Sequence, residues 1–172
     1  WWFHAAKGDD YSKIADMPVM SPLDRNIIDG FRFWAKKFEL RAEAVEKSFA
    51  RHFADPSLGY GGRVDFVGDV GGVRVVVDWK TQATKPNRPI VFYPENGVQL
   101  AAYCHGIGEP ETPGLSVVIS RTEPGRIQSY LWTEDWLWPA FRACMTLWHT
   151  PLGGGILGKQ EGTSQEVVQE ES

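Results

Sequence analysis

Hydrophobic residues recur every three or four positions over residues 23–49, the spacing of one buried helical face. Ser21, Pro22 and Asp24 are residue types favoured at a helix N-cap and first turn, so the pattern predicts a helix that begins near Ser21. Where this helix ends is left open. Residues 44–53 also alternate as a strand does, with Glu46 on the polar side.

Alternation of apolar and polar residues predicts four further strands in two hairpins: 60–67 with 73–81, and 115–121 with 126–132. A four-residue loop that contains two glycines, 69–72, is expected to join the first pair. Helical spacing predicts two more helices, around 96–106 and after residue 133. The same spacing places three tryptophans in the core: Trp34, Trp136 and Trp148.

The chain has 172 residues, enough for one domain with a sizeable core. Hydrophobic residues at 42% and charged residues at 23% are typical of a globular protein and exclude a wholly disordered one. We expect a single domain over 1–152 and a disordered, Gly-rich and then acidic tail over 153–172. No apolar run of about 18 residues predicts a membrane span, and residues 1–10 lack the pattern of a secretory signal. A cytoplasmic location is therefore expected.

Cysteine, histidine and overall charge narrow the chemistry further. Cys104 and Cys144 are too few for a four-thiolate iron–sulfur cluster, and we expect both to be buried, reduced thiols. His52, His105 and His149 lack the spacing of a zinc site. Much of the net charge of −4 lies in the acidic tail, so the charge does not exclude a nucleic-acid partner.

The first hairpin carries the candidate chemistry. Side chains alternate along a strand, so Asp78 and Lys80 lie on the same face. If Gly68 pairs with Val73, Asp65 shares that face and lies diagonal to Asp78, about 7–8 Å away at the backbone. A slip of one residue would move Asp65 to the other face. The hypothesis of a shared site therefore predicts the register.

Two carboxylates on a rigid sheet are hard oxygen ligands suited to magnesium or manganese. A lysine two residues on can hold an attacking water and stabilise charge on phosphoryl oxygens. The alternative is an ordinary hairpin whose charges form a solvated face. Arg63 shares the face of Asp65 and is a candidate for a DNA phosphate contact, with pairing to a nearby carboxylate as its alternative.

The ordered set of motifs resembles the PD-(D/E)XK nuclease superfamily, and within it the RecB-like exonucleases. The matching residues are Glu46, Gly61-Gly62-Arg63-Val64-Asp65, Val76-Val77-Asp78-Trp79-Lys80-Thr81 and Gln99-Leu100-Ala101-Ala102-Tyr103. Val64 stands where the superfamily's name has proline. The resemblance implies an α/β, restriction-endonuclease-like αβββαβ core, in which helices flank a central mixed β-sheet.

By the same resemblance the metal ligands are Glu46, Asp65, Asp78 and the backbone carbonyl of Trp79. The residues with catalytic roles are Asp65, Asp78, Lys80, Gln99 and Tyr103. In that scheme Gln99 and Tyr103 orient the lysine and also contact DNA, together with Arg63. Glu43 is the alternative to Glu46, and His4 is a further candidate ligand.

The resemblance implies a Mg- or Mn-dependent deoxyribonuclease with one or two ions, no iron–sulfur cluster and no zinc. We expect an exonuclease that acts on single strands or duplex ends in recombination, repair or phage DNA processing. A helicase or recombinase is a candidate partner, and no membrane is involved. The alternatives are a catalytically silent DNA-binding or assembly module with the same fold, and a restriction-type endonuclease.

Overall fold

The computed structural model describes residues 21–53 and 59–150. Its helices and strands, in chain order, are α2 (Pro22–Lys37), β1 (Arg41–His52), β2 (Gly59–Val70), β3 (Val73–Gln82), α3 (Pro94–Gly106), β4 (Gly114–Ser120), β5 (Ile127–Trp132) and α4 (Leu137–Trp148). The expected αβββαβ order is confirmed, with β5 and α4 added after it. His4 and the predicted tail, 153–172, lie outside the described residues.

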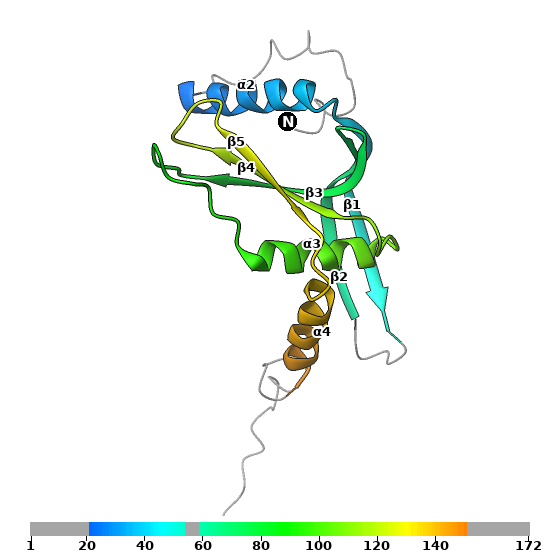
Figure 1. The fold of residues 1–172 in the computed structure, drawn as a ribbon. Coiled ribbons are helices and arrows are strands. Elements are labelled where there is room, and N and C mark those ends of the chain that lie inside the picture. The colour runs from blue at the N-terminus through cyan, green and yellow to red at the C-terminus, as the bar shows by residue number, and fades with distance from the viewer. Residues whose placement is uncertain (1–20, 54–58, 151–172) are drawn as a thin grey trace, which may run out of the picture.

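Five strands form one mixed sheet in the order β1-β2-β3-β4-β5. β1, β2 and β3 pair antiparallel, as do β4 and β5. β3 and β4 run parallel, with α3 as the crossover between them, because parallel neighbours need a long connection. The α/β fold with a central mixed sheet is therefore as predicted (Figure 1).

α2 begins where the sequence predicts. The Ser21 side chain accepts a hydrogen bond from the Asp24 backbone N–H, and the Asp24 carboxylate accepts one from the Ser21 N–H, both at 3.2 Å. This reciprocal pair satisfies two amide groups that a helix start leaves without partners. The helix ends at Lys37, and Glu39 turns the chain with a φ of 47°. Of the two alternatives for residues 44–53, the strand is correct.

The turn between β2 and β3 corrects the predicted loop. Val70 pairs with Val73, so only Gly71 and Gly72 form the connection, with φ of 64° and 83°. Positive φ at both central residues is the geometry of the two-residue turn that matches the twist of a hairpin, and glycine adopts it without a steric cost. Both strands are longer than expected, and Gly68 pairs with Val75 rather than with Val73.

The core lies on both faces of the sheet, under α2 on one side and under α3 on the other (Figure 1). The buried residues on the α2 side are Trp34, Phe66, Val75, Val77, Leu115 and Val117. Those on the α3 side are Val64, Val67, Val76, Leu100, Cys104, Trp132 and Leu137. Full burial of one such side chain contributes about 1.5–3 kcal/mol. The two layers hold β3 rigidly at the centre.

Close contacts at glycines bring α3 down onto the sheet. A Cβ atom added at Gly97 would lie 2.5 Å from the Trp132 ring, and one at Gly114 would lie 2.6 Å from Leu100. Only a residue without a side chain allows this approach, and it places α3 directly over the strands.

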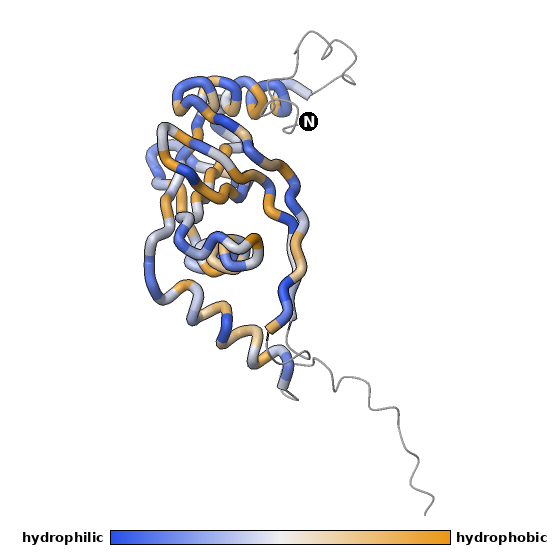
Figure 2. The backbone as a smooth tube through the Cα atoms, turned by 90° about the vertical axis from the view of Figure 1, so that its right-hand side faces the viewer, coloured by the Kyte–Doolittle hydropathy of each residue, from blue (hydrophilic) through white to orange (hydrophobic). Residues whose placement is uncertain are grey.

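α4 extends beyond the sheet below α3, as the turned view shows (Figure 2). The predicted burial of two tryptophans is wrong, because Trp136 is 48% exposed and Trp148 is 61% exposed, whereas Trp34 is buried as expected. Helical spacing creates an apolar stripe, but α4 projects past the elements that would cover it. None of the described helices is both long and apolar enough to span a membrane.

Candidate active site

Two aspartates face each other across the β2–β3 pair. Phe66 pairs with Val77 and Val67 with Val76, and one further step of this register sets Asp65 opposite Asp78. The register differs by two residues from the predicted one, in which the aspartates were diagonal. Because side chains alternate with a period of two, the shift leaves Asp65 on the predicted face. Its carboxylate Oδ2 accepts a hydrogen bond from the backbone N–H of Trp79 at 3.0 Å.

Asp78 is the most deeply buried acid of the site, with 3% of its surface exposed. Burial raises the pKa of its carboxyl group, the nearby Lys80 opposes the rise, and the Asp65 carboxylate adds to it. The Lys80 Nζ lies 3.0 Å from Oδ2 of Asp78. Among the described residues, no group completes a well-formed hydrogen bond to that oxygen. A buried, incompletely satisfied carboxylate that faces a second one has the donor chemistry of a divalent-cation site.

A hydrogen-bonded row continues from Asp78 to α3. Lys80 Nζ donates to Oε1 of Gln99 at 3.3 Å, and Nε2 of Gln99 donates to the Tyr103 hydroxyl at 2.6 Å. Gln99 and Tyr103 are four residues apart, so they lie on one helical face. The structure thus brings together the lysine and the two α3 residues singled out from the sequence, and it holds the Lys80 ammonium group from both sides.

Glu46 occupies an irregular position on β1. It lies between the pairs Val45–Phe66 and Lys47–Val64, next to Asp65 in register, and its φ is 50°. A left-handed residue that is not glycine costs on the order of 1–2 kcal/mol, and such strain concentrates at functional sites. Its carboxylate forms an ion pair with Arg63.

The ion pair with Arg63 turns the Glu46 carboxylate away from the two aspartates. In the described part of the chain, no three acidic, histidine or cysteine side chains lie close enough together to hold a metal ion. Glu46 is therefore adjacent to the aspartate pair but turned toward Arg63, the pairing that the sequence left as an alternative. Glu43, the alternative candidate ligand to Glu46, forms an ion pair with Arg74. Arg74 also forms an ion pair with Glu109 at 2.9 Å. That cluster holds β1, β3 and the loop after α3 together at the surface.

The Trp79 side chain lies on the opposite face of β3 from the acids. Its ring centroid lies 5.1 Å from that of Phe31, 5.6 Å from that of Trp34 and 6.2 Å from that of Phe66, with the rings edge-on. Packing against α2 anchors this part of β3. The Trp79 carbonyl is a candidate metal ligand by the resemblance. Packing of the Trp79 ring on the opposite face therefore fixes the backbone that carries this carbonyl.

Gln82 is a residue that the sequence analysis missed. It follows Asp78 and Lys80 at steps of two along β3, so it continues their row on the same face. Its Oε1 atom is buried without a hydrogen-bond partner among the described residues. The alternation itself was the available signal, because it extends the acidic face by one residue beyond Lys80.

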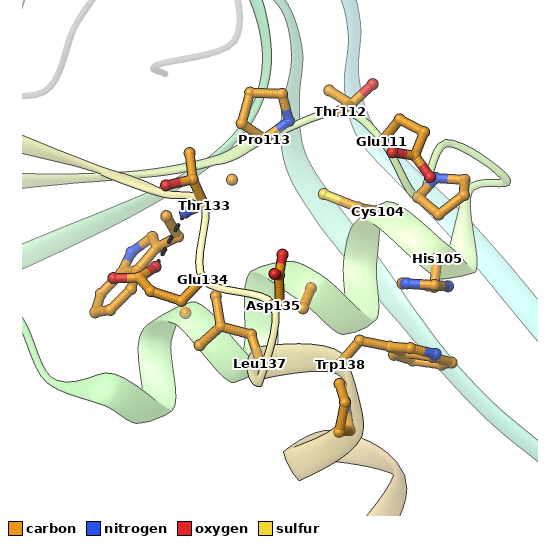
Figure 3. Close-up of a pocket in the computed structure, with 16 residues that line it drawn as sticks. Cys104, His105, Glu111, Thr112, Pro113, Thr133, Glu134, Asp135, Leu137 and Trp138 are labelled. Atoms are coloured by element: carbon orange, nitrogen blue, oxygen red, sulfur yellow. Dashed lines mark hydrogen bonds between the residues drawn. The ribbon is translucent and has the colours of Figure 1, made fainter.

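A cavity of about 470 Å³ lies between α3 and the start of α4 (Figure 3), and neither Gln99 nor Tyr103 is among its lining residues. Cys104, His105, Asp135 and Trp138 are among its lining residues. His105 stacks on Trp138 with ring centroids 3.7 Å apart, and burial lowers its pKa. Burial raises the pKa of Cys104 to about 12, so its thiol is protonated at neutral pH. The cavity contains no residue of the aspartate and lysine row.

Cys104 is buried as expected, but the expectation for the second cysteine is wrong, because Cys144 is exposed. Cys144 lies on α4, whose outer side no described element covers. The same projection of α4 that exposes Trp148 therefore exposes this thiol.

Comparison with known proteins identifies a family and a distant similarity to solved structures. The family model of the PD-(D/E)XK nuclease superfamily matches residues 15–145. A solved structure titled "Crystal structure of SSO0001" is 19% identical, with 82% of this chain and 68% of that chain covered and a TM-score of 0.43. The likeness is too distant to bear on activity. No curated protein matches the chain.

Proposed function

The chain belongs to the PD-(D/E)XK nuclease superfamily, and from that premise we propose that it is a metal-dependent deoxyribonuclease of the RecB-like kind that degrades DNA from its ends. Members of the superfamily are generally nucleases that use divalent ions such as magnesium or manganese. The observation that carries the proposal is the row formed by Asp78, Lys80, Gln99 and Tyr103, with Asp65 bound to the backbone beside it.

In this proposal Asp65 and Asp78 hold the metal, with the Trp79 carbonyl as a further ligand. Glu46 joins them after it leaves Arg63. The bound ion supplies charge stabilisation at the phosphodiester and lowers the pKa of a coordinated water. The fit rests on the buried Asp78 carboxylate, whose Oδ2 lacks a satisfactory partner, and on the hard oxygen donors that face it.

Lys80 positions the attacking water and a phosphoryl oxygen at the reacting phosphate. Its ammonium group carries three donors and its side chain is 37% exposed, so it can contact a water and a phosphoryl oxygen while it stays near Asp78. Gln99 fixes its direction through Oε1, and Tyr103 fixes Gln99 in turn. Preorganised charge of this kind stabilises the negative transition state without rearrangement during the reaction.

Arg63 is the proposed phosphate contact on β2. Its side chain is 66% exposed and bound to Glu46, so it is accessible to a DNA strand at the edge of the site. Gln99 and Tyr103 complete the proposed DNA contacts from α3.

The test is digestion of linear DNA labelled at one end, beside a covalently closed circle of the same sequence. Wild type and Lys80→Ala are compared in magnesium, in manganese and in chelator. Lys36→Ala, a change of an exposed lysine on α2, is the matched control. Metal-dependent shortening of the linear DNA, with the circle intact, Lys80→Ala inactive and Lys36→Ala active, is the expected result.

Other outcomes separate the alternatives. Cutting of the circle, with discrete fragments, would replace the exonuclease by a restriction-type endonuclease. DNA binding without cleavage in every condition would identify a silent DNA-binding or assembly module. Equal activity of Lys80→Ala and wild type would refute the role given to Lys80.

A further inference from the structure

Two loops meet at the end of the sheet toward which β3 runs. One comprises residues 83–89, directly after β3, and the other comprises residues 121–126, between β4 and β5. We call them the paired loops. Figure 1 shows the green segment after β3 and the yellow turn between β4 and β5 at the same end of the sheet. β3 and β4 are parallel and in register, with Gln82 opposite Ser120, so both loops leave the sheet side by side.

Hydroxyl groups join the paired loops to each other. The Thr84 backbone N–H donates to the Thr122 hydroxyl at 2.8 Å, and that hydroxyl donates to the Thr84 carbonyl at 2.6 Å. The Thr84 hydroxyl also contacts the Ser120 hydroxyl at 2.6 Å. Ser120 is 3% exposed, and its oxygen accepts the backbone N–H of Glu123 at 2.8 Å. The loops are therefore one hydrogen-bonded body rather than two separate segments.

Arg126, at the end of the second loop, also holds the two loops together. Its guanidinium group donates to the Lys85 carbonyl at 3.0 Å and to the Arg88 carbonyl, and it also binds the Glu123 carboxylate. The hydrogen bonds from Thr84 and Arg126 lower the pKa of Glu123. Arg126 and Glu123 thus neutralise each other, and both are committed to holding the backbone of the first loop.

Three positive charges remain without an acidic partner. Lys85, Arg88 and Arg121 are all exposed, and across residues 21–53 and 59–150 no ion pair involves any of them. The paired loops hold four basic residues and one acidic residue, in a chain whose net charge is −4. A fixed cluster of positive charge attracts a polyanion to that place.

The paired loops lie beyond the end of the β3 face that carries Asp78 and Lys80. Asp78, Lys80 and Gln82 share one face of β3, and a strand rises about 3.3 Å per residue, so Gln82 lies about 7 Å beyond Lys80. Ser120, to which Thr84 is bound, is the partner of Gln82 on β4. A polymer whose phosphate lies at Lys80 and that runs along the strand next meets Gln82 and then the paired loops.

We propose that the paired loops bind the phosphate backbone of the DNA strand next to the bond that is cut, with Lys85, Arg88 and Arg121 as the phosphate contacts and Arg126 as their positioning residue. The inference rests on the proposed function, because it assumes that the scissile phosphate lies at Lys80. Cations spread over two fastened loops fit a chain of phosphates.

The test compares two triple variants with equal loss of charge. The first is Lys85→Ala/Arg88→Ala/Arg121→Ala. The control is Arg25→Ala/Lys36→Ala/Arg142→Ala, which removes three exposed basic residues from α2 and α4. Binding of a fluorescent oligonucleotide, single-stranded and duplex, is measured between about 50 and 200 mM salt. Both triples are placed in a Lys80→Ala background so that the DNA stays intact, and circular dichroism checks that each variant is folded.

Each phosphate contact adds about 0.7 for a single strand, or 0.9 for a duplex, to the slope of log affinity against log salt. Loss of three contacts is expected to flatten the slope by about 2–3, while the control keeps the slope of the parent protein. An unchanged slope in the first variant, or an equal change in the control, would overturn the inference.

Cleavage by the same triples with Lys80 intact separates this inference from the proposed function. Metal-dependent cleavage by the wild-type protein together with an unchanged slope would refute the paired loops alone. A flattened slope in a protein that never cleaves DNA would refute the nuclease assignment and leave the paired loops as a DNA-binding surface. Hydrolysis of bis(p-nitrophenyl) phosphate is expected to be the same in the first triple and the wild type, because so small a substrate does not reach the loops.

Discussion

Replacement of Asp78 by asparagine is expected to stabilise the metal-free protein while it removes metal-dependent cleavage. The carboxylate is 3% exposed and faces Asp65, and burial raises its pKa. An unsatisfied buried polar atom costs about 1–3 kcal/mol, and a charged one more. The ion pair with Lys80 at 3.0 Å offsets part of this free-energy cost. We therefore expect Asp78→Asn to raise the free energy of unfolding by about 1 kcal/mol in chelator at pH 7.

The stability difference between Asp78→Asn and the wild-type protein is expected to depend on pH. Below the ordinary aspartate pKa of 3.8, Asp78 is protonated in both the folded and the unfolded chain, and the advantage of the variant is absent. As the pH rises from 3.8 through the raised pKa of the folded state, the unfolded chain releases its proton while the folded chain retains it. The wild-type protein therefore loses stability relative to the variant over this interval.

Excess magnesium is expected to reverse the order. A ligand that binds only the folded state stabilises it by about 2.7 kcal/mol at a hundred times its Kd, and the asparagine variant loses most of that gain because it lacks one carboxylate ligand. Wild type then exceeds the variant by roughly 1–2 kcal/mol, the difference between this gain and the advantage in chelator.

Urea unfolding in chelator and in magnesium, at pH 7 and near pH 3, measures all these differences. Asp29→Asn, an exposed change on α2, is the control, and its effect is expected to stay within about 0.5 kcal/mol. If Asp78→Asn is less stable than wild type in chelator at pH 7, the buried charge is favourable on balance. That result would refute a cation site at Asp78.

Four further substitutions test the contacts of Lys80 and the packing that supports them. Lys80→Ala is expected to slow DNA hydrolysis at least about 100-fold with an unchanged circular dichroism spectrum; hydrolysis within a few-fold of wild type would contradict its role. Tyr103→Phe removes the 2.6 Å hydrogen bond to Gln99, and because one such bond contributes about 1 kcal/mol we expect about a fivefold lower single-turnover rate, with a larger loss in Gln99→Ala. The reverse order of these two losses would show that Tyr103 acts independently of Gln99. Gly97→Ala sets a Cβ atom 2.5 Å from the Trp132 ring and is expected to lower the free energy of unfolding in urea by about 1–3 kcal/mol; a neutral effect would mean that α3 moves freely on the sheet.

Elements whose signals are local were predictable from the sequence. Ser21 and Asp24 define the start of α2, because a helix start needs partners for its own backbone amides. Alternation along β2 and β3 places Asp65, Asp78 and Lys80 on one face, and the two-residue error in register did not change this, because the side-chain period is also two.

The relations between distant segments depended on the tertiary structure. The sequence could not decide whether Glu46 lies in a helix or in a strand, nor that its backbone adopts a positive φ beside Arg63. It placed Trp148 in the core because spacing reports only which residues share a face, whereas burial depends on whether another element covers that face.

The sequence by itself identified the residues of the proposed active site and predicted that Asp65, Asp78 and Lys80 lie on one face. Only the folded chain decided the register of Asp65 against Asp78, the reach of Gln99 to Lys80 and the joining of the paired loops by Arg126. The physical reason is that propensity and alternation act over a few neighbouring residues. Contacts between residues 19 or 41 apart in the chain form only when packing of the whole core sets one element against another.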